Sequence, residues 1–430
     1  MREERQVAVT GVGAVCGLGW GIAPLWAGLR AGEPGIGPFH RFDHSRHRTH
    51  IAAEAAPVPA AVAALARSCP GWRRLSIADR FAVFAALEAL AGARLTPASL
   101  GEDGDGSWEG DLGVFFGSST GGMYESELFF ADFLRDRRRP RLASLIPQQV
   151  NAPGDAVARQ VGATGPVITF SSACASGALA LGAALAAVRS GEVEMALAGG
   201  SDSLCQLTYA GFNALRSVDE VPCRPFRAGR AGMSFGEGAA VLVLEPLERA
   251  LARGAEPLAL LAGAGASCDA HHMTAPDPAG SGAAAAVEAA LADAGLPAGA
   301  IDFVNVHGTG TPLNDAAEWQ ALRRVFGERA EGMPLVATKA LIGHLLGCSG
   351  AIEAVATVLC LHHGELHPVR AAGDPDPELP VSLVLDRPLP LPGARAAVST
   401  NLAFGGSNAA LVFSRWPDRP DRPRMAGRAA

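Results

Sequence analysis

One segment near the middle of the chain constrains the fold more than any other: residues 167–189, VITFSSACASGALALGAALAAVR. Val167–Phe170 is apolar and rich in β-formers, which predicts a buried strand. From Ala175 to Val188 nearly every residue is apolar or small, and a helix that is apolar on all sides is a buried one. A strand, a tight turn and a buried helix therefore follow one another, which is typical of an α/β domain.

Cys174 lies at the turn between this strand and this helix. The free N–H groups and the dipole at a helix N-terminus favour a thiolate over a thiol. Cys174 is therefore a candidate nucleophile, with a core cysteine as the equal alternative. Gly177 and Gly182 lower the helix propensity, and we expect another element to pack closely against them.

The composition excludes several classes of protein. The chain has 430 residues, of which 49% are hydrophobic and 18% charged, so it is globular and long enough for two domains or one large α/β unit. A net charge of −7 disfavours a nucleic-acid partner. No uninterrupted apolar run reaches membrane-spanning length, so no membrane span is expected, and the charged N-terminus leaves no room for a signal peptide. The eight cysteines lack the spacing of a zinc site, so we expect reduced thiols and a cytoplasmic protein.

The 36 basic residues include a single lysine, Lys339. A lysine that persists among so many arginines needs a compact ammonium, which a planar guanidinium does not reproduce. Glu353 lies in an otherwise apolar helical stretch, and a buried carboxylate requires a partner. We therefore predict that Lys339 and Glu353 form a pair.

Strands alternate with helices along the chain, which predicts an α/β fold with much parallel sheet. A charged helix over 245–257 would link two halves, residues 1–256 and 257–415, and the Pro/Arg-rich tail 416–430 is predicted to be disordered. The predicted strands include 112–116, 193–200 and 301–306, and the predicted helices include 20–32, 77–93 and 282–294. A strand followed by a Gly-rich turn is predicted over 6–19, and a strand-turn-strand unit over 399–413.

Residues 117–121, GSSTG, match the G-x-S-x-G elbow of serine hydrolases. Gly122 follows where a helix should begin, so a Gly-rich loop lining a pocket is the better interpretation. The acidic stretch 101–110 and the basic run 135–141 are predicted to be solvated loops.

The remaining chemistry lies in the second half. His307 ends a predicted buried strand and precedes Gly-Thr-Gly-Thr-Pro, and His344 follows Lys339 by five residues. Residues 403–408, AFGGSN, form a glycine turn that carries a bulky aromatic. Together with Cys174 these residues supply a nucleophile, two imidazoles, an ammonium and free N–H groups, which is the equipment for acyl transfer through a thioester.

The motifs SSACASG, VNVHGTGTP, TKALIGHLLGCSGAIE and AFGGSN resemble those of the β-ketoacyl-acyl-carrier-protein synthases, most closely the elongating type I/II condensing enzymes, over residues 5–415. The resemblance implies a thiolase-like fold, in which two duplicated α/β halves form a five-layered αβαβα arrangement. It implies an acyltransferase that joins an acyl thioester to malonyl-acyl-carrier protein by decarboxylative Claisen condensation, in fatty acid or polyketide elongation. It also implies a homodimer, or a heterodimer with a chain-length-factor-like subunit.

By position in these motifs, Cys174 corresponds to the acyl-accepting nucleophile. His307 and His344 correspond to the pair that assists malonyl decarboxylation, and Lys339 to the lysine that contacts Glu353 and orders the histidine site.

The other positions correspond to residues that bind substrate. The N–H groups of Cys174 and Phe404 would form an oxyanion hole, and the Phe404 ring would gate the acyl pocket. No organic cofactor is implied, because the phosphopantetheine arm belongs to the acyl carrier protein. The resemblance assigns Thr309 and Thr311 to the pantetheine arm, Thr120, Phe212 and Thr274 to the acyl pocket, and Arg216 to carrier-protein docking.

Three departures from the family pattern stand out. Arg230-Ala231-Gly232 replaces a frequent Arg-Asp-Gly and so lacks a local carboxylate. Ala403 replaces a frequent glycine before Phe404, and because alanine resists positive φ we expect the gate to open less freely. Some members hold a structural monovalent cation near the equivalents of Asn305 and Glu353; the shifted Thr400-Asn401 leaves that ion open, and no other metal is expected.

Two alternatives remain. A non-catalytic chain-length-factor subunit usually lacks the nucleophile, which this chain retains together with both histidines. A thiolase acting on coenzyme A typically uses a second catalytic cysteine, and Cys348 and Cys360 do not form that pattern.

Overall fold

The structure is a computed structural model that describes residues 5–60, 62, 63, 69, 71–96, 111–136, 142–370 and 372–416. The acidic stretch 101–110, most of the basic run 135–141 and the tail 417–430 lie outside the described residues, so the predictions made for them stay predictions.

The first half of the chain builds one sheet around three parallel strands. Its order is β1-β9-β7-β5-β6, in which β1–β9 and β9–β7 are antiparallel and β7–β5 and β5–β6 are parallel. The strands are β1 (Val7–Cys16), β5 (Leu112–Gly117), β6 (Val167–Phe170), β7 (Met195–Asp202) and β9 (Gly238–Pro246).

The second half repeats this pattern. Its order is β10-β17-β16-β11-β12, with two antiparallel pairs followed by two parallel pairs, and β14 (Ser382–Leu383) extends its edge. The two halves are joined where β1 pairs with β10 through Ala8–Leu260 and Val9–Ala259. The strands are β10 (Ala259–Cys268), β11 (Phe303–Asn305), β12 (Pro334–Val336), β16 (Ala396–Leu402) and β17 (Ser407–Ser414).

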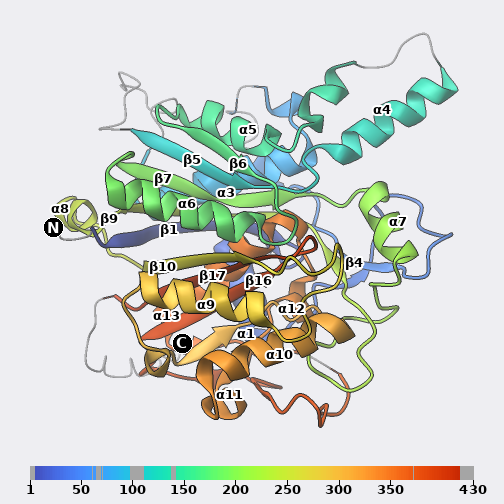
Figure 1. The fold of residues 1–430 in the computed structure, drawn as a ribbon. Coiled ribbons are helices and arrows are strands. Elements are labelled where there is room, and N and C mark those ends of the chain that lie inside the picture. Colours follow the sequence, from blue (N-terminus) through green and yellow to red (C-terminus); the bar gives the residue numbers. More distant parts are fainter. Residues whose placement is uncertain are drawn as a thin grey trace, which may run out of the picture.

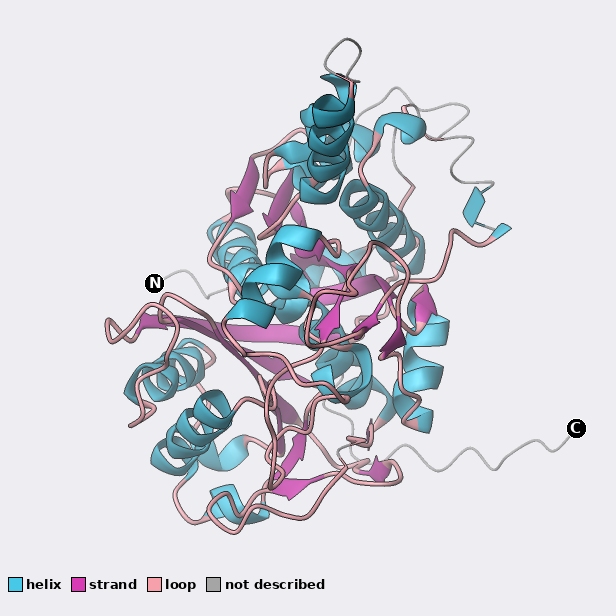
Figure 2. Cartoon of the chain, turned by 90° about the vertical axis from the view of Figure 1, so that its right-hand side faces the viewer, coloured by secondary structure: helices cyan, strands magenta, loops and turns pink. Residues whose placement is uncertain are grey.

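Helices form the other three layers (Figure 1; Figure 2 shows the same chain from the side). The first half's outer face is covered by α3 (Ile77–Gly92) and α5 (Ala152–Val161), and the second half's by α9 (Ser281–Asp293) and α10 (Pro312–Phe326). Between the halves lie α6 (Ser176–Ser190) and α13 (Ser349–His363), each in contact with strands of both halves. The predicted duplicated five-layered fold is confirmed.

Close packing of the two central helices requires glycine, as predicted for α6. A Cβ on Gly177 would lie 2.8 Å from the Ala351 nitrogen of α13, and one on Gly182 would lie 3.1 Å from the Ala264 Cβ of β10. The windows 173–190 and 346–363 are apolar enough to span a membrane by length and composition alone, but 61% and 89% of their residues are buried in the fold. Both windows are core helices.

The prediction that Val167–Phe170 is buried is wrong. This segment is β6, the outermost strand of the first half, and the residues Val167 and Ile168 are 41% and 40% exposed. An edge strand has one neighbour in its sheet, so its apolar sequence is left uncovered in the single chain.

Shorter elements complete the described chain. The helices are α1 (Ile22–Ala31), α4 (Met123–Arg135), α7 (Gln206–Ala214), α8 (Leu247–Ala252), α11 (Arg329–Gly332) and α12 (Lys339–Ile342), with 3-10 turns at Trp72–Arg74, Leu142–Gln148, Ala298–Ala300 and Leu346–Cys348. The strands are β2 (Gly19–Trp20), β3 (Gly37–Pro38), β4 (Ile51–Ala53), β8 (Phe235–Gly236), β13 (Glu365–Leu366) and β15 (Leu389–Pro390).

Candidate active site

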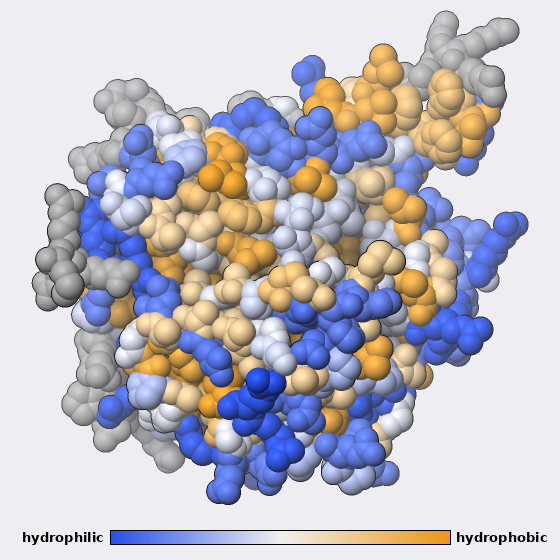
Figure 3. All heavy atoms as spheres, viewed as in Figure 1, coloured by the Kyte–Doolittle hydropathy of each residue, from blue (hydrophilic) through white to orange (hydrophobic). Residues whose placement is uncertain are grey.

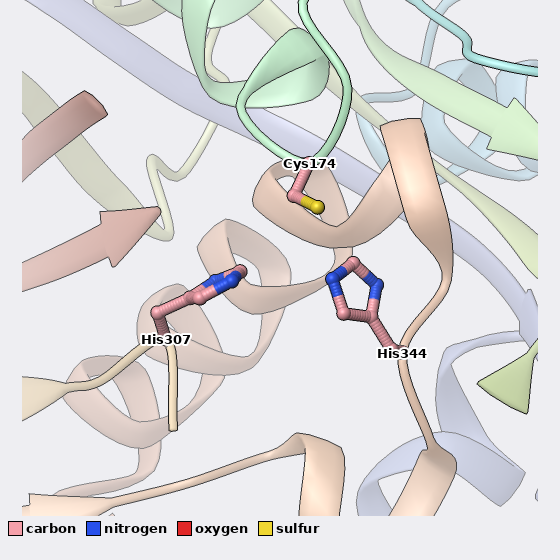
Figure 4. A group of neighbouring side chains, drawn as sticks. All are labelled: Cys174, His307 and His344. Atoms are coloured by element: carbon pink, nitrogen blue, oxygen red, sulfur yellow. The ribbon is translucent and has the colours of Figure 1, made fainter. Parts of the chain in front are cut away.

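Three side chains from distant parts of the sequence meet between the two halves. Cys174 precedes the first residue of α6 by two positions, His307 follows β11, and His344 follows α12. The Cys174 Sγ and one ring nitrogen of each histidine all lie within 4.8 Å of one another. Figure 4 shows the three side chains pointing toward one another. The structure therefore brings the predicted nucleophile and both predicted imidazoles together.

Burial is the largest influence on the pKa of the Cys174 thiol. The residue is 7% exposed, and desolvation raises its pKa to about 11. The charge of Lys339 and hydrogen bonds from the N–H groups of Phe404 and Cys174 lower this pKa without overcoming burial. The expectation of a thiolate is therefore wrong for the free protein, and the thiol must lose its proton at the moment of attack.

Both histidines are held neutral. Burial, and next the charge of Lys339, lowers the pKa of His307 and of His344 well below the usual value. The Leu346 N–H donates to Nδ1 of His344 at 2.9 Å, so this nitrogen is an acceptor. The proton of the neutral His344 ring must then lie on Nε2.

Lys339 makes the predicted contact with Glu353, as an ion pair between buried side chains. Its Nζ also lies 3.0 Å from Nδ1 of His307. Because an ammonium can only donate, Nδ1 of His307 accepts, and the ring proton again lies on Nε2. Burial raises the pKa of Glu353 to about 7, Lys339 opposes this shift, and Asn401 Nδ2 donates to the second carboxylate oxygen at 2.7 Å.

Two buried carboxylates that hold the site were missed in the sequence. Glu318 accepts the N–H groups of His307 at 2.7 Å and Gly308 at 2.9 Å. Asp202 accepts the N–H groups of Thr120 at 2.8 Å and Gly347 at 2.6 Å, and so ties the loop after β5 to the turn after His344. The acid at the end of the apolar strand β7 was a readable signal for Asp202, whereas nothing in the helical stretch around Glu318 marks that residue.

A cavity of about 310 Å³ opens onto the three reactive side chains. Five of the residues assigned to substrate by resemblance line it together with Phe404, and Arg216 is exposed there. A larger hollow of about 670 Å³ beside Trp20 contains none of the assigned residues. The five residues are Phe212, Arg216, Thr274, Thr309 and Thr311.

Thr120 does not line this cavity. Its hydroxyl donates to Oδ1 of Asp202 at 2.9 Å, and the side chain is 5% exposed, so it supports the loop instead. The neighbouring Ser119 donates to the Ala173 carbonyl at 3.2 Å rather than to a base. The loop at 117–121 is a carboxylate-bound turn, and it lacks the serine–histidine contact of a hydrolase elbow.

The gate residue Phe404 is stacked on Phe212, with ring centroids 5.3 Å apart and planes at 15°. The turn places positive φ at Gly405 (87°) and Gly406 (81°), and not at Ala403. The alanine therefore causes no backbone strain in this conformation. A restriction on opening stays a prediction.

Arg230 is not short of carboxylates, although its sequence neighbour is alanine. It forms an ion pair with Asp376 from a distant loop, and its Nε lies 3.5 Å from Asp315 Oδ2. The tertiary structure therefore supplies the carboxylates that the local sequence lacks.

Two buried oxygens of β16 have no hydrogen-bond partner, Ser399 Oγ and Asn401 Oδ1, and Asn401 is the residue whose amide nitrogen donates to Glu353. They lie two residues apart on β16, and Ser399 pairs in register with Asn305. Unpartnered neutral oxygens are suitable ligands for a hard cation, and the monovalent ion that the sequence left open stays a prediction.

The comparisons with known proteins agree with this geometry. Residues 4–250 match the family model "Beta-ketoacyl synthase, N-terminal domain" and residues 258–372 match "Beta-ketoacyl synthase, C-terminal domain". The 3-oxoacyl-[acyl-carrier-protein] synthase 2 of Staphylococcus aureus is 34% identical over 428 residues, which cover 97% of this chain and all of that protein.

Solved structures of related proteins resemble this chain over nearly its whole length. The ishigamide ketosynthase/chain length factor superposes with a TM-score of 0.88 at 33% identity, over 96% of this chain and all of the other. A ketosynthase in complex with its type II polyketide acyl-carrier protein, bound to the hexaketide, gives 0.84 at 26% identity over the same shares. This chain belongs to the β-ketoacyl synthase family.

Proposed function

We propose that this chain is a β-ketoacyl-acyl-carrier-protein synthase, an acyltransferase that joins an acyl thioester to malonyl-acyl-carrier protein with loss of CO₂. The observation that carries the proposal is the buried thiol of Cys174, with a nitrogen of each of two neutral imidazoles within 4.8 Å of it. The retained cysteine and both histidines argue against a non-catalytic partner subunit. Cys348 is buried with a pKa raised well above the usual value by burial, which gives a thiolase no second reactive thiol there.

The first half-reaction transfers the acyl group to Cys174. The Cys174 thiol gives up its proton as Sγ attacks the thioester carbonyl, because the raised pKa leaves little thiolate beforehand, and the proton passes to the carrier-protein sulfur. The N–H groups of Cys174 and Phe404 converge on the sulfur and so are placed to bind the oxyanion. The carrier-protein sulfur leaves and receives the proton.

The second half-reaction forms the carbon–carbon bond. Malonyl thioester loses CO₂, and the electron pair of the broken bond becomes an enolate whose oxygen accepts hydrogen bonds from Nε2 of His307 and His344. The enolate carbon attacks the Cys174 thioester, and the cysteine sulfur leaves as a thiolate that takes up one proton from water. A neutral imidazole can donate a hydrogen bond to the enolate oxygen through its N–H group. Burial and the charge of Lys339 keep both rings neutral.

We propose acyl carrier protein as the partner, since a structural relative is complexed with one. The hydroxyls of Thr309 and Thr311 lie 2.9 Å apart on the cavity wall, where they would contact the pantetheine arm. Arg216 is exposed on the same cavity and would meet an acidic carrier protein. The arm arrives with that partner, so we propose no resident organic cofactor, and a cytoplasmic reaction suits the eight free thiols.

We further propose a homodimer formed through the exposed edge strand β6. Uncovered apolar edge strands are pairing surfaces. A second apolar surface lies on α4 and the turn at 142–148, where Phe130, Leu134, Leu142 and Ile146 are 58–73% exposed. Figure 3 shows this surface as a hydrophobic arm at the upper right.

The test of the function is reconstitution with acyl- and malonyl-carrier proteins. We expect β-ketoacyl-carrier protein and CO₂ in equal amounts, and no β-ketoacyl product from a Cys174→Ala variant that keeps the wild-type circular dichroism. Product formed with coenzyme A thioesters alone, without decarboxylation, would favour a thiolase instead.

A further inference from the structure

A second group of histidines lies outside the reactive cavity, in the loop between β3 and β4. The segment at 40–50, HRFDHSRHRTH, contains four histidines. Three of them, His40, His44 and His50, line one open hollow of about 570 Å³ together with Asp43. None of the steps of the condensation uses these residues.

Two of these side chains already converge as metal ligands do. Nδ1 of His44 and Nδ1 of His50 lie 3.0 Å apart. Two ligand nitrogens on one metal ion, each at about 2.0–2.1 Å, are separated by about 2.9 Å in square-planar and about 3.4 Å in tetrahedral coordination. The observed separation falls between these values, so an ion could bridge the pair with little movement of either ring.

The backbone fixes the orientation of the His44 ring. Its Nε2 lies 3.1 Å from the Phe39 carbonyl oxygen, which can only accept, so Nε2 carries the proton. The lone pair of a neutral ring is then on Nδ1, facing His50. A histidine whose second nitrogen is held by a backbone carbonyl is the usual arrangement of a metal-ligating imidazole. Stacking of the His44 ring on Phe39, at 4.3 Å between centroids, holds it further.

We propose that His44 and His50 form a binding site for a divalent first-row transition cation such as Zn²⁺, with Asp43 and His40 on the same hollow as further ligands. The Asp43 side chain is exposed, and its Oδ1 accepts a hydrogen bond from the Ser45 N–H at 2.9 Å. Imidazole and carboxylate together suit Zn²⁺ and its neighbours better than Mg²⁺ or Ca²⁺. In the described part of the chain, only Cys174, His307 and His344 bring three ligand atoms within 4.8 Å, so the proposed site would complete its shell from Asp43, His40 or water.

The remaining histidine of the loop supplies the control. His47 does not line the hollow and packs its ring on Tyr209 of α7, at 5.4 Å between centroids. The loop is anchored on α7 independently, because the Tyr209 hydroxyl donates to the Thr49 carbonyl at 2.8 Å. Removing His44 or His50 should therefore leave the fold intact.

The experiment is a Zn²⁺ titration of tag-free protein by isothermal calorimetry, with the melting temperature measured with and without Zn²⁺. We expect His44→Ala and His50→Ala each to lose one equivalent of bound Zn²⁺ and the rise in melting temperature that it causes, while His47→Ala keeps both. His44→Gln and His50→Gln, which keep side-chain bulk, should behave like the alanine variants.

Any Zn²⁺ bound at Cys174 and its two histidines is common to all of these proteins and cancels in the comparison. Equal Zn²⁺ stoichiometry and equal melting shifts in wild type, His44→Ala and His50→Ala would overturn the proposal, and the pair would then be a hydrogen bond between two imidazoles. The result does not depend on condensation activity, so it tests the proposed cation site independently of the proposed function.

Discussion

Nζ of Lys339 lies 3.0 Å from Nδ1 of His307, and the same ammonium is paired with a buried carboxylate. This contact sets both the charge and the tautomer of the imidazole. A neutral ring with its proton on Nε2 can stabilise an enolate, whereas the opposite tautomer would present a lone pair to it. The only lysine of the chain is thus placed where an ammonium, and not merely a positive charge, is required.

Lys339→Ala should reduce CO₂ release from malonyl-carrier protein by at least about 100-fold, while transfer of the acyl group to Cys174 falls by less than about 10-fold. Lys339→Arg should fail similarly, because a guanidinium is larger and its donors point elsewhere. The measurement is single-turnover acyl-enzyme formation by intact mass, paired with CO₂ release. Wild-type condensation by Lys339→Arg would show that the lysine is an accident of composition.

The pH profile of decarboxylation follows from the two histidines. Burial and Lys339 lower the pKa of both rings well below 6.5, so the rings stay neutral and the rate should stay flat as pH falls from 8 to about 6.5. The acidic limb should appear only at lower pH. Lys339→Met removes the positive charge that lowers the pKa of both rings. The acidic limb, measured on the residual activity of this variant, should therefore lie at higher pH. A limb that does not move would mean that burial alone sets these pKa values.

Glu318→Gln tests the carboxylate that holds the backbone of His307. One of the two accepted N–H groups, from His307 or Gly308, would then face an amide NH₂ instead of an oxygen. A hydrogen bond to a charged group contributes about 1.5–3 kcal/mol, so decarboxylation should fall by about 10–100-fold. Acyl transfer should change little, and Glu328→Gln, at an exposed position, should be silent. Equal losses in both half-reactions would mean that Glu318 acts on the fold as a whole.

Arg216→Glu should raise KM for the carrier-protein substrate and leave a small pantetheine thioester nearly unaffected, because the exposed arginine would meet an acidic protein and not the reacting atoms. Arg387→Glu removes an exposed arginine that does not line the cavity, so it controls for net charge. Identical losses on both substrates would assign Arg216 a structural role.

Ile168→Asp should convert a dimer into monomer, since it places a charge on the 40%-exposed edge strand β6. Leu251→Asp, on a comparably exposed leucine of α8, is the matched control. Size-exclusion chromatography with light scattering measures the mass directly. An unchanged dimer in the β6 variant would place the interface elsewhere.

Much of the fold was readable because it depends on local patterns. The apolar helix at 175–188, the glycines that admit close packing and the lysine–glutamate pair all follow from residue types in sequence. The thiol of Cys174 and strand β6 were misjudged for a different reason. Desolvation of the sulfur and exposure of an edge strand depend on what surrounds them in three dimensions, which a one-dimensional pattern does not contain.

The residues to which the family resemblance assigns contact with substrate fall into two groups. Phe212, Thr274, Thr309 and Thr311 line the cavity, whereas Thr120 is bound to Asp202. A short side chain that follows a strand can face either a cavity or a buried carboxylate. The sequence pattern does not show which of the two it meets in the fold. Glu318 accepts backbone N–H groups eleven and ten residues before it, and such anchoring leaves no spacing signature in the sequence.

One single-turnover measurement tests the proposed condensation most directly. Wild-type protein is loaded with an acyl group from acyl-carrier protein, and malonyl-carrier protein is then added while acyl-enzyme mass, CO₂ and β-ketoacyl product are followed together. The account predicts that the acyl group sits on Cys174 and leaves it in step with equal amounts of CO₂ and product. Acyl-enzyme that persists after malonyl-carrier protein is added, or product formed at the wild-type rate by Cys174→Ala, would contradict it.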